Sequence, residues 1–454
     1  MPSAPHDPPH DPPHDRPHDP LRDPPPAQLT TPADFASFPP EAWEPLLRLA
    51  RFATRPLERF LRIEAASGVA LIAAAAIALV WANSPWAESY AHLWHTPLGI
   101  RVGALSLERS LEWLVNDALM VVFFFVVGVE IRRELHHGEL SEWRRAALPA
   151  LAALGGVVTP ALLFLALAGA PETRAGWAVP TATDIAFAVG VLTLLDKRVP
   201  AALRVLLLAL AVIDDLAAIV IIALFYSSGV RVEGFLVALL GLGLIFALRA
   251  AGVRRHAVYV LPGAVVWAGI SLAGVHPTIA GVIIGLVTPV TPWRGVSPAE
   301  TLIEALHPWV AFGIMPVFAL ANAGVTLGGL SFDDTSVRAT AAVAVGLVLG
   351  KPVGVVLAVA LATRLKIAAL PAGLTKRHVV VLGVTAGIGF TMALFVAQLA
   401  FQAPALLAAA KLGVLLASTC AMIGGLVVGR ALLRPTASAV AAATADEAER
   451  STER

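Results

Sequence analysis

The chain contains twelve apolar segments, each close to the length that crosses a lipid bilayer. A membrane-spanning helix needs about 20 consecutive, mostly apolar residues. Inside the bilayer every backbone polar group has to be hydrogen-bonded within the protein, so such a span is a helix. The sequence therefore predicts an all-α polytopic membrane protein. The segments cover approximately residues 63–83, 109–131, 146–169, 176–195, 201–226, 232–250, 256–273, 276–291, 307–327, 339–362, 378–400 and 406–432.

Composition supports this class and excludes others. The chain is 57% hydrophobic and 14% charged, with a mean hydropathy of +0.76. Its net charge of +1 gives no general attraction to nucleic acid. Membrane lipid is the expected surrounding of so apolar a chain. The single cysteine, Cys420, excludes a disulfide framework and a cysteine-based metal site within one chain. Residues 1–40 lack the apolar core of a secretory signal, so we expect the first membrane helix to direct insertion.

Three regions are expected along the chain. Residues 1–58 form an N-terminal tail, residues 59–433 the membrane domain, and residues 434–454 a C-terminal tail. The N-terminal tail repeats His-Asp-Pro-Pro with small variations, which predicts a disordered or polyproline II segment. Its regularly spaced histidines are either part of a solvated tail or loose ligands for nickel, zinc or copper. From Trp43 onward, apolar residues at helical spacing predict a short interfacial helix.

The distribution of basic residues between loops predicts the orientation. Basic residues accumulate in the short cytoplasmic loops of membrane proteins. Loops after odd-numbered segments carry five, Arg101, Arg109, Arg174, Arg231 and Arg338. Loops after even-numbered segments carry fourteen: Arg132, Arg133, Arg144, Arg145, Lys197, Arg198, Arg249, Arg254, Arg255, Arg294, Arg364, Lys366, Lys376 and Arg377. Both termini are therefore expected on the cytoplasmic side.

Two segments contain residues that interrupt a helix. Pro180 precedes Thr181–Asp184 in the fourth segment, and the eleventh contains Thr385–Thr391 with two glycines. Proline removes a helical hydrogen bond, and clustered glycine and threonine weaken the helix. Irregular backbone at membrane depth is tolerated only where it is buried in protein or lines a cavity. Paired broken helices of this kind indicate the binding site of a secondary transporter.

Two adjacent aspartates, Asp214 and Asp215, lie inside the fifth apolar segment. A charged group at the bilayer centre costs about 2.5–3.5 kcal/mol on insertion scales, and such groups are usually functional. The alternative is a buried aspartate that pairs with an arginine for packing alone. The two carboxyls would titrate as a coupled pair. Carboxylate oxygens also suit a hard cation, so the pair predicts a site that exchanges protons for Na⁺ or Li⁺.

Thr183, Asp184 and Lys351 are further candidates within membrane segments. A threonine hydroxyl beside a carboxylate can ligate a cation, although Asp184 can instead serve only as a helix cap. A buried lysine needs a carboxylate partner or loses its charge. We therefore expect Lys351 to form an ion pair with an aspartate, which is either a switch that protons and cations break or a purely structural pair.

Charged residues also cluster at the end of the second segment. Glu130 and Glu134 share a helix face, with Arg133 alongside, and His307 opens the ninth segment. These residues could form a titrating funnel, but on the residues alone a solvated helix end is the favoured interpretation. Asp117, another acid inside the membrane, receives no role from the sequence.

Taken together, these residues resemble the NhaA family of bacterial Na⁺/H⁺ antiporters. The resemblance runs from about Glu64 to Leu433, and its motifs occur in the family's order. The motifs are Asn116-Asp117, Val127 to Glu130, Glu134-Leu135, Pro180 to Gly190, Ile213 to Leu216, His307-Pro308-Trp309, Ala321 to Gly324, Gly350-Lys351-Pro352 and Gly387 to Met392.

The resemblance implies a role for each candidate residue. Asp214 and Asp215 would be the central carboxylates that bind Na⁺, with Lys351 paired to Asp214. Thr183 and Asp184 would lie where two broken helices cross at mid-membrane in an inverted-repeat transporter fold. The family's cytoplasmic pH-sensing funnel would correspond to Glu130, Arg133, Glu134 and His307. Residues 84–108 would form a β-hairpin through which two copies dimerise.

The implied activity is electrogenic, pH-regulated Na⁺(Li⁺)/H⁺ exchange by alternating access in the bacterial inner membrane. No cofactor is implied beyond the transported ions. The chain departs from a better-known member at Glu300, where that member has a basic residue, and at Ile303, where it has a glutamate. We therefore expect ion exchange to be retained and its activation pH to differ.

Two other classes also place acids in a membrane. An intramembrane aspartyl protease usually carries its two carboxyls on separate helices, one within Gly-x-Gly-Asp, whereas this chain reads Gly387-Ile388-Gly389-Phe390. A zinc protease is excluded because no His-Glu-x-x-His occurs. A symporter for an organic solute fits the fold but has no aromatic or arginine-based substrate motif to support it.

Overall fold

The computed structural model describes residue 63 and residues 66–102, 105–227, 229, 231–292, 297–329 and 333–434. The predicted N-terminal tail, its histidine repeat and the interfacial helix after Trp43 lie outside the described residues. All of the predicted C-terminal tail beyond residue 434 also lies outside them.

Each of the twelve predicted segments contains a helix. Two of these helices, His256–Leu272 and Thr278–Val287, are apolar but shorter than the candidate membrane spans. Three more involve bent pairs: Ala66–Ala82 with Ala87–His95, Pro171–Thr181 with Ile185–Leu194, and Lys376–Ala386 with Phe390–Ala400. Seven continuous runs in the described part are long and apolar enough to cross a membrane: Leu111–His137, Trp143–Leu167, Ala201–Phe225, Val232–Ala250, Pro298–Asn322, Asp334–Arg364 and Pro404–Leu432.

Helix boundaries differ most from prediction where a polar first turn precedes the apolar run. The ninth helix begins at Pro298 rather than at 307, because the Ser297 side chain accepts a hydrogen bond from the Glu300 N–H and caps it. The tenth begins at Asp334 rather than at 339. Hydropathy marks where lipid begins, whereas capping chemistry marks where the helix begins.

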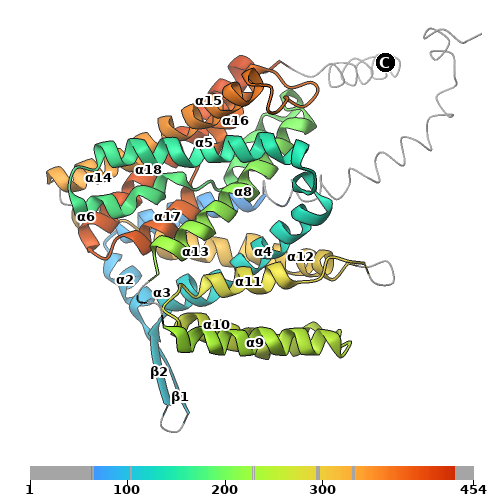
Figure 1. The fold of residues 1–454 in the computed structure, drawn as a ribbon. Coiled ribbons are helices and arrows are strands. Elements are labelled where there is room, and N and C mark those ends of the chain that lie inside the picture. Colours follow the sequence, from blue (N-terminus) through green and yellow to red (C-terminus); the bar gives the residue numbers. More distant parts are fainter. Residues whose placement is uncertain are drawn as a thin grey trace, which may run out of the picture. The chain divides into compact units, whose positions relative to one another are not determined.

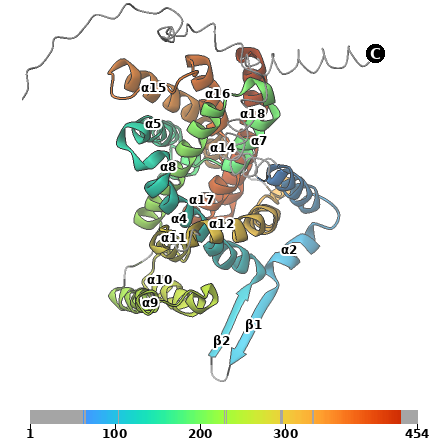
Figure 2. The ribbon, with the colours of Figure 1, turned by 90° about the vertical axis from the view of Figure 1, so that its right-hand side faces the viewer.

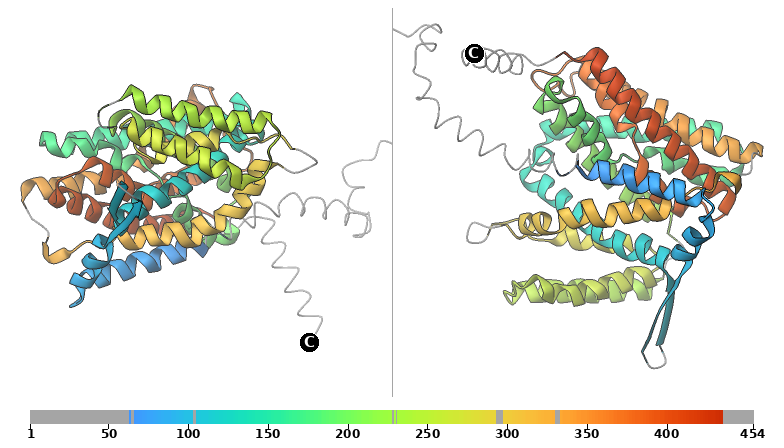
Figure 3. Two further views of the ribbon diagram at one scale, coloured as in Figure 1. Left: turned by 90° about the horizontal axis from the view of Figure 1, so that it is seen from below. Right: turned by 180° about the vertical axis from the view of Figure 1, so that it is seen from behind.

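The helices group into two bundles by their contacts, and Figures 1 and 3 show α9 and α10 side by side at one edge. The two bundles meet mainly where α4 contacts α8 and where α13 contacts α17. The first bundle consists of α4 (Met120–His137), α9 (Val232–Ala250), α10 (Val260–Leu272), α11 (Thr278–Val287), α12 (Pro298–Trp309) and α13 (Met315–Asn322). The second consists of α5 (Trp143–Leu167), α7 (Ile185–Leu194), α8 (Ala201–Phe225), α14 (Asp334–Val345), α15 (Lys351–Arg364), α16 (Lys376–Ala386), α17 (Phe390–Ala400) and α18 (Pro404–Leu432).

A β-hairpin extends away from the helices (Figure 2). Strands β1 (Pro97–Val102) and β2 (Leu105–Ser110) pair antiparallel, from Pro97 opposite Ser110 to Val102 opposite Leu105. The hairpin occupies only the second part of the predicted insert, since residues Ala87–His95 form helix α2, bent by 114° from Ala66–Ala82. The β-hairpin that the resemblance implies is therefore present over a shorter stretch.

Helices α5 and α15 cross with their backbones in direct contact. A Cβ atom on Gly155 would lie 2.3 Å from the Gly354 carbonyl oxygen, and one on Gly354 would lie 2.1 Å from the Gly155 carbonyl oxygen. Any side chain at either position would therefore separate the helices. The crossing lies one turn from Lys351, whose position in the bundle consequently depends on these two glycines.

We expect Gly354→Ala to lower the melting temperature of the purified protein. Overpacking a close-packed interior costs about 1–3 kcal/mol, which outweighs the gain in helix propensity. Gly243→Ala in α9 is the matched control, because no atom lies within 4 Å of the added methyl group there. Equal melting temperatures for both variants, measured in the same detergent, would show that the α5–α15 crossing tolerates a methyl group.

Candidate functional site: a cavity at the crossing of two broken helices

The two interrupted segments break and cross as their sequences predict. Helix α6 (Pro171–Arg174) continues as a 3₁₀ helix to Thr181 and meets α7 at an angle of 47°. The second break lies between α16 and α17, which meet at 46°. The Asp184 N–H donates a hydrogen bond of 2.7 Å to the Ile388 carbonyl oxygen, so each break satisfies a backbone group of the other.

Asp184 connects the starts of both following half-helices. Its Oδ1 accepts a hydrogen bond of 3.3 Å from the Phe187 N–H and thereby caps α7. Its Oδ2 accepts one of 3.1 Å from the Thr391 N–H in α17, and another from the Thr391 hydroxyl. A carboxylate at two helix N-termini is favoured by both helix dipoles. The predicted capping role is thus present, and it extends to a second helix.

Thr391 was missed as a site residue by the sequence analysis, although its segment was recognised as broken. The available signal was its position in the sequence. Thr391 lies two residues after Gly389, in the first turn of the second half-helix, so its hydroxyl lies close to the break. Only the crossing brings Thr391 to Asp184, which lies 207 positions earlier in the chain.

Lys351 forms a buried ion pair with Asp214, the partner that the resemblance implies. Their Nζ and Oδ2 atoms are 2.8 Å apart, and neither side chain is exposed. The Thr183 hydroxyl donates a hydrogen bond of 2.6 Å to the same oxygen, and Lys351 also donates to the Thr181 carbonyl. A π-helical turn, Gly346–Gly350, immediately precedes Lys351 on its helix. Within the described residues the other oxygen of Asp214, Oδ1, has no hydrogen-bond partner.

Asp215 differs from its neighbour because it lines a cavity. The cavity has a volume of about 70 Å³, and Asp184, Thr183 and Thr391 also line it. Asp215 is only 3% exposed, and the Lys351 ammonium bonds to its neighbour Asp214 instead. Such a space accommodates a water molecule or a small cation, which needs at least about 10–15 Å³. The structure therefore separates the predicted pair into a paired carboxyl, Asp214, and an open one, Asp215.

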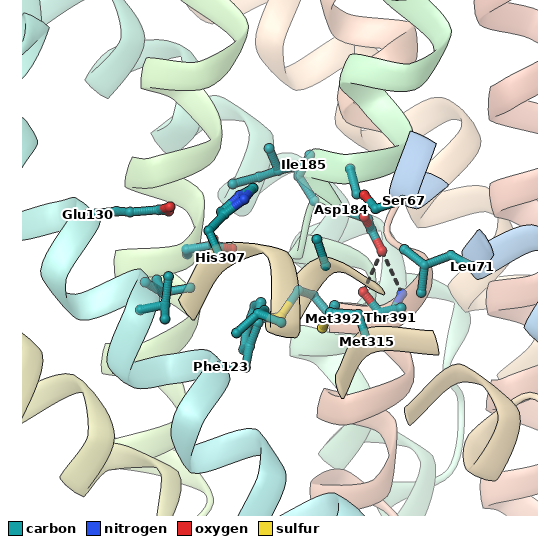
Figure 4. Close-up of a pocket in the computed structure, with 17 residues that line it drawn as sticks. Ser67, Leu71, Phe123, Glu130, Asp184, Ile185, His307, Met315, Thr391 and Met392 are labelled. Carbon is teal, nitrogen blue, oxygen red and sulfur yellow. Dashed lines mark hydrogen bonds between the residues drawn. The ribbon is translucent and has the colours of Figure 1, made fainter. Parts of the chain in front are cut away.

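Two members of the predicted pH-sensing group, Glu130 and His307, line the same cavity (Figure 4). Figure 4 places them across the cavity from the hydrogen-bonded pair Asp184 and Thr391. The other two members are not among the lining residues; Arg133 and Glu134 form an ion pair of 3.4 Å at the end of α4. The interpretation as a solvated helix end therefore describes Arg133 and Glu134 better than it describes Glu130.

The two departures from the family pattern lie on α12 and differ in environment. Glu300 is exposed in the first turn. Ile303 is buried and packs with Val129, Val290 and Ala299. Val129 directly precedes Glu130 in α4. An apolar contact therefore stands where the better-known member has a glutamate, close to the cavity-lining Glu130.

Asp117, which the sequence left without a role, lies in a π-helical turn, Leu114–Leu119, before α4. Its Oδ1 is 3.6 Å from Nε2 of His276, which is also partly buried. The sequence analysis did not single out His276 because a lone histidine near a proline carries no pattern.

The cavity presents carboxylate and hydroxyl oxygens, which are the ligands preferred by hard cations. In the described ranges, no three His, Cys, Asp or Glu side chains converge in a way that could hold a metal ion. The donor set therefore suits a weakly held, transported ion better than a resident transition metal.

Comparison with known proteins identifies the family. Residues 58–428 match the Na⁺/H⁺ antiporter 1 family. The chain is 60% identical to Na⁺/H⁺ antiporter NhaA 2 of Myxococcus xanthus, over 93% of this chain and 99% of the relative. It is 51% identical to Na⁺/H⁺ antiporter NhaA 2 of Sorangium cellulosum, again over 93% and 99%, and 56% identical to NhaA of an Acidovorax species, over 87% and 96%. This multi-pass helical membrane protein therefore belongs to the Na⁺/H⁺ antiporter 1 family.

Proposed function

We propose that this protein exports Na⁺ across the bacterial cytoplasmic membrane in exchange for protons, with Asp215 as the carboxyl that alternates between the two. The observation that carries the proposal is the open position of Asp215 on a buried cavity, beside Asp184 and Thr183. The relatives named as Na⁺/H⁺ antiporters support the same activity. Li⁺ is expected to share the site because carboxylate and hydroxyl oxygens suit small hard cations.

In this proposal Asp214 and Lys351 influence Asp215 through their charges. While Asp214 is paired with Lys351, its charge is balanced and Asp215 exchanges its proton for a cation. A cation that also contacts the unpartnered Oδ1 of Asp214 would compete with Lys351 for that carboxylate. Exchange of the single Asp215 proton for one Na⁺ moves no net charge, so electrogenic exchange needs a second proton, which the Lys351 ammonium gives up when a cation takes its place at Asp214. One net charge then moves per cycle, and a membrane potential contributes about 2.3 kcal/mol per 100 mV.

The cavity is assigned to the cytoplasmic side. The loops at the ends of α4 and α9 carry the basic residues that predict this side, and Glu130 lies near that end of α4. In this orientation both termini are cytoplasmic. Glu130 and His307 then lie between the cytoplasm and Asp215, where their charge states act on the site in response to pH.

Dimerisation through the hairpin is proposed on the basis of its backbone. In the described structure β1 and β2 pair only with each other, so both outer strand edges are available. An isolated two-stranded hairpin is marginally stable, and an open edge favours pairing with another strand. A second copy of this chain, held in the same membrane, supplies such a strand.

A protease is disfavoured by the same geometry. Asp214 and Asp215 are adjacent on one helix, and Asp214 is bound by Lys351 and Thr183. Two carboxyls of an aspartyl protease have to share one water between them, which this arrangement prevents.

We expect Asp215→Asn to abolish Na⁺-driven proton movement in vesicles while leaving the melting temperature close to that of the wild type. Asparagine retains the shape but neither releases a proton nor offers a full charge, and the buried ion pair between Asp214 and Lys351 remains intact. Asp334→Asn, at an exposed position, is the matched control. Wild-type exchange by a correctly inserted Asp215→Asn variant contradicts the assignment.

Asp214→Asn and Lys351→Ala should differ from Asp215→Asn by also lowering the melting temperature. Removing one partner of a buried ion pair costs about 3–5 kcal/mol, because the other charge remains in the interior. Lys351→Arg retains the charge and should lose less stability than Lys351→Ala. If the double variant Asp214→Asn/Lys351→Ala melts below both single variants, the ion pair does not account for the loss.

Glu130→Gln should move the midpoint of activity to lower pH, with little change in Na⁺ affinity at saturating alkaline pH. Loss of a negative charge beside the cavity favours the ionised form of the carboxyls that remain there. Glu134→Gln is the matched control, since Glu134 lies one turn further along α4 and pairs with Arg133. Ile303→Glu is less informative because it places a carboxyl in an apolar cluster. Coincident pH profiles for Glu130→Gln and the wild type would remove Glu130 from pH sensing.

A further inference from the structure

Three amide side chains form a hydrogen-bonded cluster between the two bundles. Asn322, at the end of α13, donates a hydrogen bond of 2.8 Å to Oδ1 of Asn116 and one of 2.9 Å to the Phe318 carbonyl oxygen. Gln398 of α17 donates to Oδ1 of Asn322. Asn322 is 0% exposed. Asn116 and Asn322 belong to the first bundle, whereas Gln398 belongs to the second.

The cluster lies at the opposite ends of the helices that carry Glu130 and His307. Asn116 precedes Glu130 by 14 positions in the run Leu111–His137, which is roughly 21 Å along a helix. Asn322 follows His307 by 15 positions in the run Pro298–Asn322, a rise of roughly 22 Å. Both helices therefore carry the cavity residues Glu130 and His307 toward one end and the amides toward the other end.

Phenylalanine rings fill the space between the cavity and the amides. Phe124, Phe318 and Phe395 are each no more than 1% exposed. The ring centre of Phe395 lies 5.4 Å from that of Phe124 and 6.2 Å from that of Phe318. Glu130 and His307 thus line the cavity toward one end of these helices, while packed rings and bonded amides lie toward the other end.

We propose that Asn116, Asn322 and Gln398 form a latch that holds the two bundles together on the outward side, and that the bond between Gln398 and Asn322 breaks whenever Asp215 faces outward. The proposal rests on the proposed function, in which Asp215 is exposed to each side in turn. A relative movement of the two bundles preserves bonds within the first bundle and breaks the bond between bundles. Asn116 and the Phe318 carbonyl orient the Asn322 amide, so that its oxygen remains directed at Gln398.

The test measures how often the site opens outward. Cys420 is replaced by serine and Ala186, which lines the cavity on α7, by cysteine. A membrane-impermeant maleimide is then added to the outward side of oriented vesicles. The labelling rate is proportional to the outward-facing fraction, so even a rare state is measured. Loss of one hydrogen bond changes a population by about fivefold, and Gln398→Leu should therefore raise the outward labelling rate by about fivefold.

Gln402→Leu is the matched control, because Gln402 is an exposed glutamine four residues beyond Gln398. It should leave the rate unchanged. Asn322→Leu should raise the rate as well, and the double variant with Gln398→Leu should add little, because the two share one bond. Equal rates for Gln398→Leu and Gln402→Leu, or fully multiplicative effects in the double variant, overturn the latch. Labelling requires no ion transport, so a failure of Na⁺/H⁺ exchange in the unmodified protein is a separate result that concerns the proposed function alone.

Discussion

Two breaks in membrane-embedded helices are stable here because each satisfies the other. An unpaired backbone group in the bilayer is costly, and a single broken helix would leave several. At the crossing, the Asp184 N–H bonds to the Ile388 carbonyl, and the Asp184 carboxylate bonds to the start of α17. The remaining features of the site, from the cavity to the position of Asp215, depend on this crossing. It creates polar, irregular backbone at a depth where continuous helices would present only side chains.

The two adjacent aspartates have different environments because they point to different neighbours. On a helix, consecutive side chains diverge by about 100°, which directs Asp214 to Lys351 and Thr183 and Asp215 to the cavity. A buried, well-bonded ion pair therefore lies beside a carboxyl that lines the cavity. The close crossing of Gly155 and Gly354 holds Lys351 within reach of Asp214, so packing far from the cavity contributes to its electrostatics.

The sequence predicted the features that depend on local chemistry. Each apolar segment that hydropathy marked contains a helix in the described part of the chain, and proline and glycine located both breaks. It predicted an acidic partner for Lys351, since a lysine buried without one loses its charge. It did not identify Thr391, His276 or the amides of Asn116, Asn322 and Gln398, because their partners lie far away in the chain; Asn116 and Asn322 are 206 positions apart. Helical periodicity shows that Asp214 and Asp215 diverge but not toward what, so only the resemblance, and not the residues alone, paired Asp214 with Lys351.

In the proposed function Asp215, and not Asp214, exchanges a proton for Na⁺. Infrared difference spectroscopy of the purified protein tests it directly, because a protonated carboxyl has a carbonyl band that an ionised carboxylate lacks. On addition of Na⁺ at constant pH, the account predicts loss of this band in the wild type and in Asp214→Asn, and no such loss in Asp215→Asn. A Na⁺-induced loss that persists in Asp215→Asn, or that disappears only in Asp214→Asn, would contradict it.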